Sequence, residues 1–182
     1  MTPWITKPIP FNIGQAFGET VPPEQTCYTL DSIARIGIGG NANHITRLGV
    51  EVETGHDMIG KNVSQMTFYI GNEHGSSLTG DMVLKIYDSS GTLQATSDET
   101  YDASGLPTTP YTAVYTISHT FVDGDRAVIQ GCTACTSGAN EVFVQGNSNT
   151  TQFSNQFYVK FRDDTGWANV GTNTNCQFCF TA

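Results

Sequence analysis

The sequence predicts an all-β protein: an antiparallel jelly-roll β-sandwich with an extended N-terminal arm. Apolar and polar residues alternate with a period of two in several short segments, as they do in half-buried strands. These segments follow one another at regular spacing with no helix of consequence between them, a pattern typical of sandwiches and jelly rolls. Five of the seven prolines lie in the first 26 residues, where they favour an extended chain and oppose a helix.

We expect two parts, an arm over residues 1–32 and a sandwich over residues 33–182. The arm has two interpretations. It is either an edge strand and loop of its own domain, or a segment donated to a neighbouring subunit. Its apolar residues would fill pockets on the acceptor in the second case. They are Trp4, Ile9, Phe11, Ile13 and Phe17.

The first strands of the sandwich lie in residues 27–40 and 45–53. The first of these ends in a glycine-rich stretch, and the second alternates, with Leu48, Val50 and Val52 facing inward. The clearest alternation follows in residues 60–97, which predict two strands and the start of a third. Their inward residues are Met66, Phe68 and Ile70, then Met82, Leu84 and Ile86.

The remaining strands are shorter and are separated by polar turns. Residues 98–110 form a polar connection, residues 111–121 a strand, and Asp123-Gly124-Asp125 a hairpin-type turn. Further strands are expected at residues 127–130, 141–145, 156–162 and 177–181, with residues 163–175 as a polar turn region. In the strand at 156–162, Phe157, Val159 and Phe161 are expected to face inward.

The overall charge argues against several partners. The chain has 182 residues, which suits one domain, and its net charge is −9 with 8 Lys and Arg residues. A phosphate backbone and an anionic membrane would both repel it, so we expect no nucleic acid as a partner. No run of 18 apolar residues occurs, so we expect no membrane insertion. The N-terminus lacks the pattern of a signal peptide, so we expect either a removed signal or release by another route, such as lysis.

The five cysteines are the strongest local signal: Cys27, Cys132, Cys135, Cys176 and Cys179. Four of them form two C-x-x-C pairs, a spacing that zinc sites also use. Disulfides are the alternative that suits an oxidising, extracellular setting, and two bonds would leave one thiol over. Fully reduced cysteines are the third alternative.

No motif predicts catalysis. The sequence contains no H-E-x-x-H and no G-x-S-x-G motif, so we expect a non-enzymatic protein. Asp123 and Asp125 lie in a turn that lacks the ligand spacing of an EF-hand and is expected to be solvated.

Aromatic residues offer a binding surface. Tyr69 and Tyr158 have the outward parity of their strands, and Trp167 lies in a polar turn. Outward aromatic rings can stack on sugars, so these three are candidates for carbohydrate binding. Packing against the sandwich rim or against a neighbouring subunit is the alternative.

The chain resembles a jelly-roll module of archaeal, phage and archaeal-virus surface and structural proteins, which is similar to carbohydrate-binding and laminin-G-like sandwiches. The resemblance covers residues 33–181 and lies in five segments: GKNVSQMTFYI, SSLTGDMVLKIYDSSGTLQATS, DASGLPTT, DGDRAVIQ and NQFYVKFRDDTGW. It implies a structural role at a virion or cell surface. Because such modules often hold a structural calcium ion, it leaves calcium open at Asp123 and Asp125, with no other cofactor expected.

The sequence thus leads to one principal hypothesis. We expect a non-enzymatic structural subunit of an extracellular assembly, either a virion component (tail, fibre, turret or capsid decoration) or a cell-surface filament subunit. It would assemble through its arm with further copies or with other subunits. A carbohydrate-binding module, with glycans as partners, is the alternative.

Overall fold

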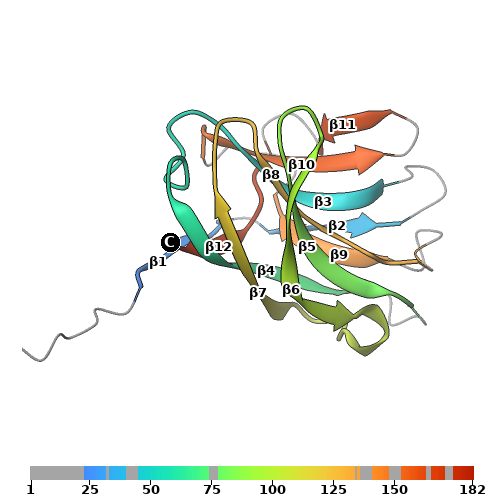
Figure 1. Ribbon diagram of the computed structural model, residues 1–182. Coiled ribbons are helices and arrows are strands. Elements are labelled where there is room, and N and C mark those ends of the chain that lie inside the picture. The colour runs from blue at the N-terminus through green and yellow to red at the C-terminus, as the bar shows by residue number, and fades with distance from the viewer. Residues whose placement is uncertain are drawn as a thin grey trace, which may run out of the picture.

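Two antiparallel sheets pack face to face in the computed structural model (Figure 1). The structure describes residues 23–31, 33–39, 45–73, 78–133, 135, 141–147, 153–162, 165–170 and 174–182. The first sheet contains β1 (Gln25–Tyr28), β2 (Ala34–Ile38), β4 (Asn62–Asn72), β7 (Tyr111–Thr120), β9 (Val142–Gly146) and β12 (Phe178–Thr181). The second contains β3 (Ile45–Val52), β5 (Asp81–Tyr87), β6 (Leu93–Asp102), β8 (Arg126–Gln130), β10 (Gln156–Arg162) and β11 (Gly166–Asn169).

The central strand of the first sheet is β4. On one side it pairs with β7 along most of its length, and on the other it pairs with β12 and then β9, which lie end to end. Beyond these, β1 pairs with β12 and β2 pairs with β9. The first sheet therefore has β7 as one edge and β1 with β2 as the other.

The second sheet has the order β11-β10-β3-β8-β5-β6. Its edge strand β6 lies beside β7, the edge strand of the first sheet, and the 3-10 turn η1 (Ala103–Gly105) leads from one to the other. We call this line, where β6 and β7 lie side by side, the seam. In Figure 1 the seam runs between β6 and β7, the two long strands on the near side.

The predicted core residues are buried between the sheets. In β4 and β5, Met66, Phe68, Met82 and Leu84 are each 0% exposed, because these alternate positions carry large apolar side chains on the face turned to the other sheet. Burying each such side chain stabilises the fold by roughly 1.5–3 kcal/mol. The prediction of an all-β sandwich is confirmed, and its jelly-roll connectivity stays a prediction.

The N-terminal boundary differs from the prediction. Residues 25–28 were expected in the arm, yet they form β1 and pair with β12 inside the first sheet. The sandwich therefore begins no later than Gln25. The five arm residues singled out in the sequence, Trp4, Ile9, Phe11, Ile13 and Phe17, lie outside the described residues.

Two other segments also differ. β6 continues to Asp102, through residues expected to be a polar connection, because the Ser97 hydroxyl accepts a hydrogen bond from Leu84 N–H at a break in the ladder. β11 forms within the expected turn region, where Trp167 pairs with Phe161 of β10. Neither strand has the alternation of apolar and polar residues on which the prediction relied.

Candidate functional site

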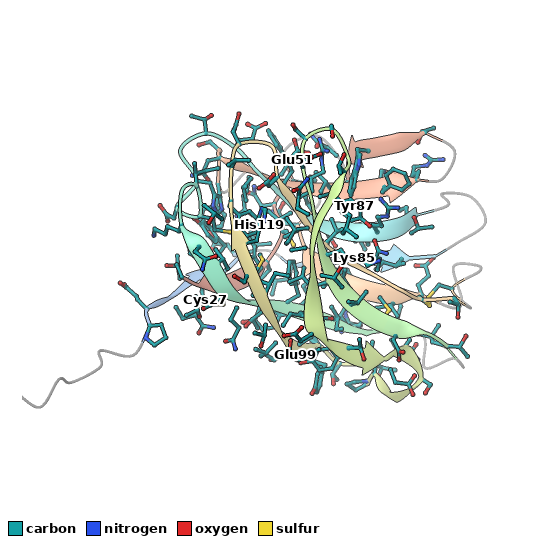
Figure 2. All side chains as sticks on the ribbon, viewed as in Figure 1. Cys27, Glu51, Lys85, Tyr87, Glu99 and His119 are labelled. Carbon is teal, nitrogen blue, oxygen red and sulfur yellow. A yellow bond between two sulfur atoms is a disulfide. The ribbon has the colours of Figure 1, made fainter. Side chains whose placement is uncertain are left out.

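The seam closes the sandwich with side chains in place of a backbone ladder. The hydroxyl of Tyr101, on β6, accepts a hydrogen bond from Val114 N–H at 2.8 Å and donates one to Val114 C=O at 2.8 Å. The phenol oxygen of Tyr101 thus satisfies both backbone groups of Val114, as a paired residue on a neighbouring strand would. Two residues further along, Thr116 donates from its N–H and its hydroxyl to the carboxylate of Glu99 (Figure 2).

These two side chains cap the β7 edge where its pairing with β4 is regular. Alternate residues of an antiparallel strand direct their N–H and C=O groups to the same edge, so Val114 and Thr116 both face away from β4. After Thr116 the register shifts, with Ser64 of β4 opposite both Ile117 and Ser118, so the alternation does not continue through Ser118. The caps therefore satisfy three backbone groups of β7: the N–H and C=O of Val114 and the N–H of Thr116.

A groove of about 310 Å³ lies beside the seam, at Thr116 and the two residues that follow it. Ile117, which is 4% exposed, and the half-buried Ala95 are its apolar residues. The remaining residues of its lining are small or polar: Thr96, Asp98, Thr116 and Ser118.

The carboxylate of Glu99 is held in its charged form. The hydrogen bond from the Thr116 hydroxyl is the largest cause that lowers the pKa of Glu99, and the Thr116 N–H adds to it. Because a charged carboxylate is a strong acceptor, this cap stays in place at neutral pH.

β1 is anchored at the opposite edge of the first sheet. A disulfide joins Cys27 of β1 to Cys179 of β12, and the two residues stand directly opposite in the ladder (Figure 2). The next residue, Tyr28, stacks on His56 at 4.7 Å and on Phe178 at 5.1 Å between ring centroids. A strand of only four residues is thus fixed covalently and by aromatic packing.

The other cysteines complete the predicted pattern of two disulfides and one remaining thiol. Cys132 bonds Cys135 within a loop, and Cys176 is a buried free cysteine. Burial raises the pKa of the Cys176 thiol well above its usual range, so the sulfur stays protonated. The two C-x-x-C pairs do not join in one tetrahedral site, since Cys179 pairs with Cys27; the disulfide alternative is confirmed.

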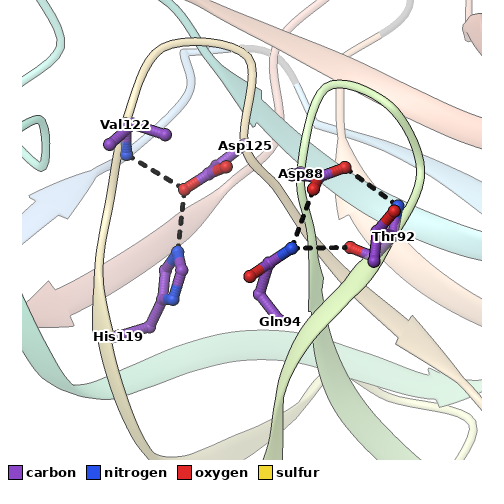
Figure 3. Close-up of polar contacts among 6 residues, drawn as sticks. All are labelled: Asp88, Thr92, Gln94, His119, Val122 and Asp125. Carbon is purple, nitrogen blue, oxygen red and sulfur yellow. Dashed lines mark hydrogen bonds and ion pairs between the residues drawn. The ribbon is translucent and has the colours of Figure 1, made fainter.

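The predicted calcium turn lies at one end of the molecule, beside the turn between β5 and β6 (Figure 3). Asp125 is 1% exposed, and its Oδ2 lies 2.8 Å from His119 Nε2 and accepts from Val122 N–H at 2.9 Å. Asp123 is exposed. In the described ranges no group of three or more His, Cys, Asp or Glu side chains converges to hold a metal, and calcium stays a prediction.

The neighbouring turn is held by Asp88. Its carboxylate accepts from the N–H groups of Ser90 and Thr92, from the Ser90 hydroxyl and from the Gln94 amide. The Ser90 hydroxyl is the largest cause that lowers the pKa of Asp88. The carboxylates of Asp88 and Asp125 are each hydrogen-bonded within their own turn, so the arrangement orders two loops.

The outer face of the second sheet carries a cluster of aromatic rings and arginines. The guanidinium of Arg47 lies 4.5 Å from the centroid of Tyr87, 4.1 Å from Phe161 and 5.7 Å from Trp167. We call these four residues the Arg47 cluster. Among the described residues, no carboxylate or carbonyl is hydrogen-bonded to Arg47.

A second arginine beside the cluster is fully engaged. Arg126 lies 5.0 Å from the Trp167 ring, and its Nε donates to Glu51 at 2.7 Å. Its Nη1 donates to the carbonyls of Asp88 and Ser89, each at 3.1 Å. Arg126 therefore fixes the β5–β6 turn, whereas Arg47 keeps its N–H donors for solvent or a ligand.

The three predicted carbohydrate-binding residues do not share a surface. Trp167 is half-buried on the outer face of the second sheet, and Tyr69 is half-buried on the first sheet with its hydroxyl 3.8 Å from Cys179 Sγ. Tyr158 is 0% exposed and donates to Val144 C=O at 2.7 Å across the core. The prediction that Tyr158 faces outward is wrong.

The parity of β10 is opposite to the prediction, because its apolar face is covered on the outside of the second sheet. Phe157, Val159 and Phe161 face outward and are covered by Trp167 and Arg47, where the sequence predicted them to face inward. A signal for the true parity lay in β9. A Cβ at Gly146 would lie 2.2 Å from the Tyr158 ring, so glycine makes room there for the inward tyrosine.

No family profile, curated protein or solved structure matches this chain in comparisons with known proteins. In the parts of the chain that the structure describes, no helix has both the length and the apolar character needed to cross a membrane.

Proposed function

We propose that this chain is a non-enzymatic structural subunit of an extracellular assembly, either a virion component such as a tail, fibre, turret or capsid decoration, or a subunit of a cell-surface filament. Its arm joins it to neighbouring copies. The observation that carries this proposal is the Cys27–Cys179 disulfide, located where the arm joins the sandwich.

The position of this disulfide supports a mechanical role. A four-residue edge strand would peel from β12 under a pulling force, because only a few hydrogen bonds hold it. The disulfide transfers force from the arm to β12, which pairs with the central strand β4. Disulfides form in oxidising compartments, so their presence supports the extracellular setting.

Deletion of residues 1–17 tests the proposal. We expect the shortened chain to keep the β signal in circular dichroism and to lose assembly in electron microscopy, because the described sandwich begins later in the chain. A matched control replaces Asn12 and Gln15 by serine, which changes two polar residues and keeps the apolar ones. Normal assemblies from the deletion variant would overturn the proposal, and loss of the β signal would assign the arm to its own domain's core.

The Arg47 cluster favours a second candidate function, glycan binding. Trp167 and Phe161 present aromatic rings beside an arginine with free N–H donors, and such a surface can stack on a sugar ring while the guanidinium binds its hydroxyl or carboxylate groups.

Glycan binding makes a distinct prediction. Arg47→Gln and Trp167→Ala should each abolish retention on a glycan array, with Tyr69→Phe, on the other sheet, as the control that keeps it. Melting temperatures measured in parallel separate lost binding from lost folding. If the wild-type chain is retained on no glycan, glycan binding is refuted and only the structural role stands.

A further inference from the structure

We propose that the Arg47 cluster, together with Lys85 on the same face of the second sheet, binds a sugar that carries a carboxylate, such as a uronic or sialic acid residue. Arg47 is the partner of the carboxylate. This inference rests on the second candidate function, glycan binding, and names the class of ligand for it.

The guanidinium of Arg47 is held by its flat faces and keeps its edge available. Its carbon lies 4.1 Å from the ring centroid of Phe161 and 4.5 Å from that of Tyr87. Stacking on rings uses the faces of a guanidinium, so the N–H donors, which lie in its plane, remain for another partner. In the part of the chain that the structure describes, Arg47 has no hydrogen bond and no ion pair. The rings therefore fix the donors of a half-buried arginine without satisfying them.

The neighbouring carboxylates do not compete for Arg47. Glu51 is the one acidic residue of β3, and Arg126 binds it at 2.7 Å. Asp81 is the one acidic residue of β5 and begins that strand, whereas Tyr87 ends it. An anion for Arg47 thus has to come from outside these two strands.

Positive charge is concentrated on this sheet although the protein as a whole is acidic. The strands β3, β5, β8, β10 and β11 hold five of the 8 Lys and Arg residues and two of the 17 Asp and Glu residues of the chain. Lys85 shares the parity of Tyr87 on β5, from which both project in Figure 2. Like Arg47, it has no hydrogen bond or ion pair among the described residues. Two bases without acidic partners on one face attract an anionic ligand.

A carboxylated sugar matches both the charged and the aromatic part of this surface. The two oxygens of a carboxylate accept two parallel N–H bonds from one guanidinium, which a single hydroxyl cannot do. Trp167 lies beside Phe161, with 5.0 Å between the ring centroids, and is half-buried, so part of its ring is open to stack on the sugar. Lys85 adds a second positive charge for the same ligand.

Two pairs of glycans that differ in charge test the class of ligand. Oligogalacturonate carries a carboxylate on each ring, and its methyl ester keeps the rings without the charges; sialyllactose and lactose form the second pair. On an array at low salt, we expect the wild-type chain to be retained about ten-fold more strongly on the acid than on its neutral partner in at least one pair. The preferred pair identifies the sugar that supplies the carboxylate. Equal retention on acid and neutral partner overturns the carboxylate and leaves glycan binding standing, whereas no retention on any glycan overturns both.

Variants of the two bases test the residues. Arg47→Lys keeps the charge and loses the planar pair of donors, so retention on the preferred acid should fall about ten-fold. Lys85→Gln should lower it less, about three-fold, because Lys85 acts through charge attraction. Lys61→Gln removes one positive charge at an exposed position outside the second sheet and is the matched control, which should bind as the wild type does.

Melting temperatures of all three variants check that the fold is kept. If Arg47→Lys folds and binds as well as Lys61→Gln, then Arg47 only packs the rings and the proposal is overturned. If Arg47→Lys does not fold, the comparison of acid and neutral glycans on the wild-type chain still decides.

Discussion

At the residue scale, His56 shows how burial sets the charge state of a group in the core. It is 3% exposed, its Nδ1 accepts from Met58 N–H at 3.2 Å, and its ring stacks on Tyr28. Its Nε2 is buried without a partner among the described residues. Desolvation therefore lowers the pKa of His56 to about 4, and the ring is neutral at physiological pH.

This histidine predicts acid sensitivity. A folded-state pKa of about 4, against 6.5 in the unfolded chain, means that the stabilisation is complete above pH 6.5 and is lost as pH falls toward 4. The loss should approach about 3 kcal/mol of unfolding free energy, at about 1.4 kcal/mol for each pKa unit. Urea titrations between pH 7 and pH 4 on the wild type and His56→Phe measure it. The variant should lose less stability over this range, and parallel curves would refute the assignment.

At the scale of elements, the seam depends on two side chains that replace backbone pairing. β6 and β7 belong to different sheets, and in the described chain they lie in contact with no regular ladder between them. Tyr101 spans this junction with its hydroxyl, and its ring packs edge-on against Tyr115 at 5.1 Å. The strand edge is satisfied there while the two sheets keep their own twist.

Removing this one hydroxyl should weaken the seam. Tyr101→Phe keeps the ring packing and leaves both backbone groups of Val114 without their partner, which should cost about 1–3 kcal/mol. Tyr111→Phe is the matched control, because Tyr111 is 42% exposed and packs against the same ring. Urea denaturation measures stability, and hydrogen exchange should accelerate at the Val114 amide only in Tyr101→Phe. A stability equal to that of the control would show that water replaces the hydroxyl.

At the scale of the whole molecule, the two disulfides constrain the chain very differently. Cys27–Cys179 links residues 152 apart in sequence and joins the first strand to the last. Cys132–Cys135 links residues 3 apart and closes one loop. In the chain-entropy account, a disulfide stabilises the fold by restricting the unfolded chain, and the effect grows with the length of the closed loop.

The two bonds should therefore differ in their contribution to stability. Replacing Cys27 and Cys179 by serine should lower the unfolding free energy by about 5 kcal/mol, and replacing Cys132 and Cys135 by about 2 kcal/mol. Denaturant unfolding of the two double variants, under oxidising conditions, compares them. Equal losses would mean that local packing at the two sites outweighs the restriction of the unfolded chain.

The sequence alone predicted the sandwich wherever a strand has one apolar face. In β5 and β7 the inward positions are apolar and their neighbours are largely polar, so the period of two leaves one choice of face. The two disulfides with one thiol left over followed from the number of cysteines and the polar composition. These properties are local, because each depends on residues close together in the chain.

The tertiary structure decided what depends on contacts between distant segments. β10 places its apolar parity on the outer face, and only its packing against Val144 and beneath Trp167 selects Tyr158 as the inward residue. The pairing of Cys27 with Cys179 requires the first strand to lie beside the last one. The side-chain caps at the seam join β6 to β7, and neither sequence carries a sign that the two strands meet. Such relations arise from the folded arrangement of whole strands, which the spacing of residues within any one strand does not encode.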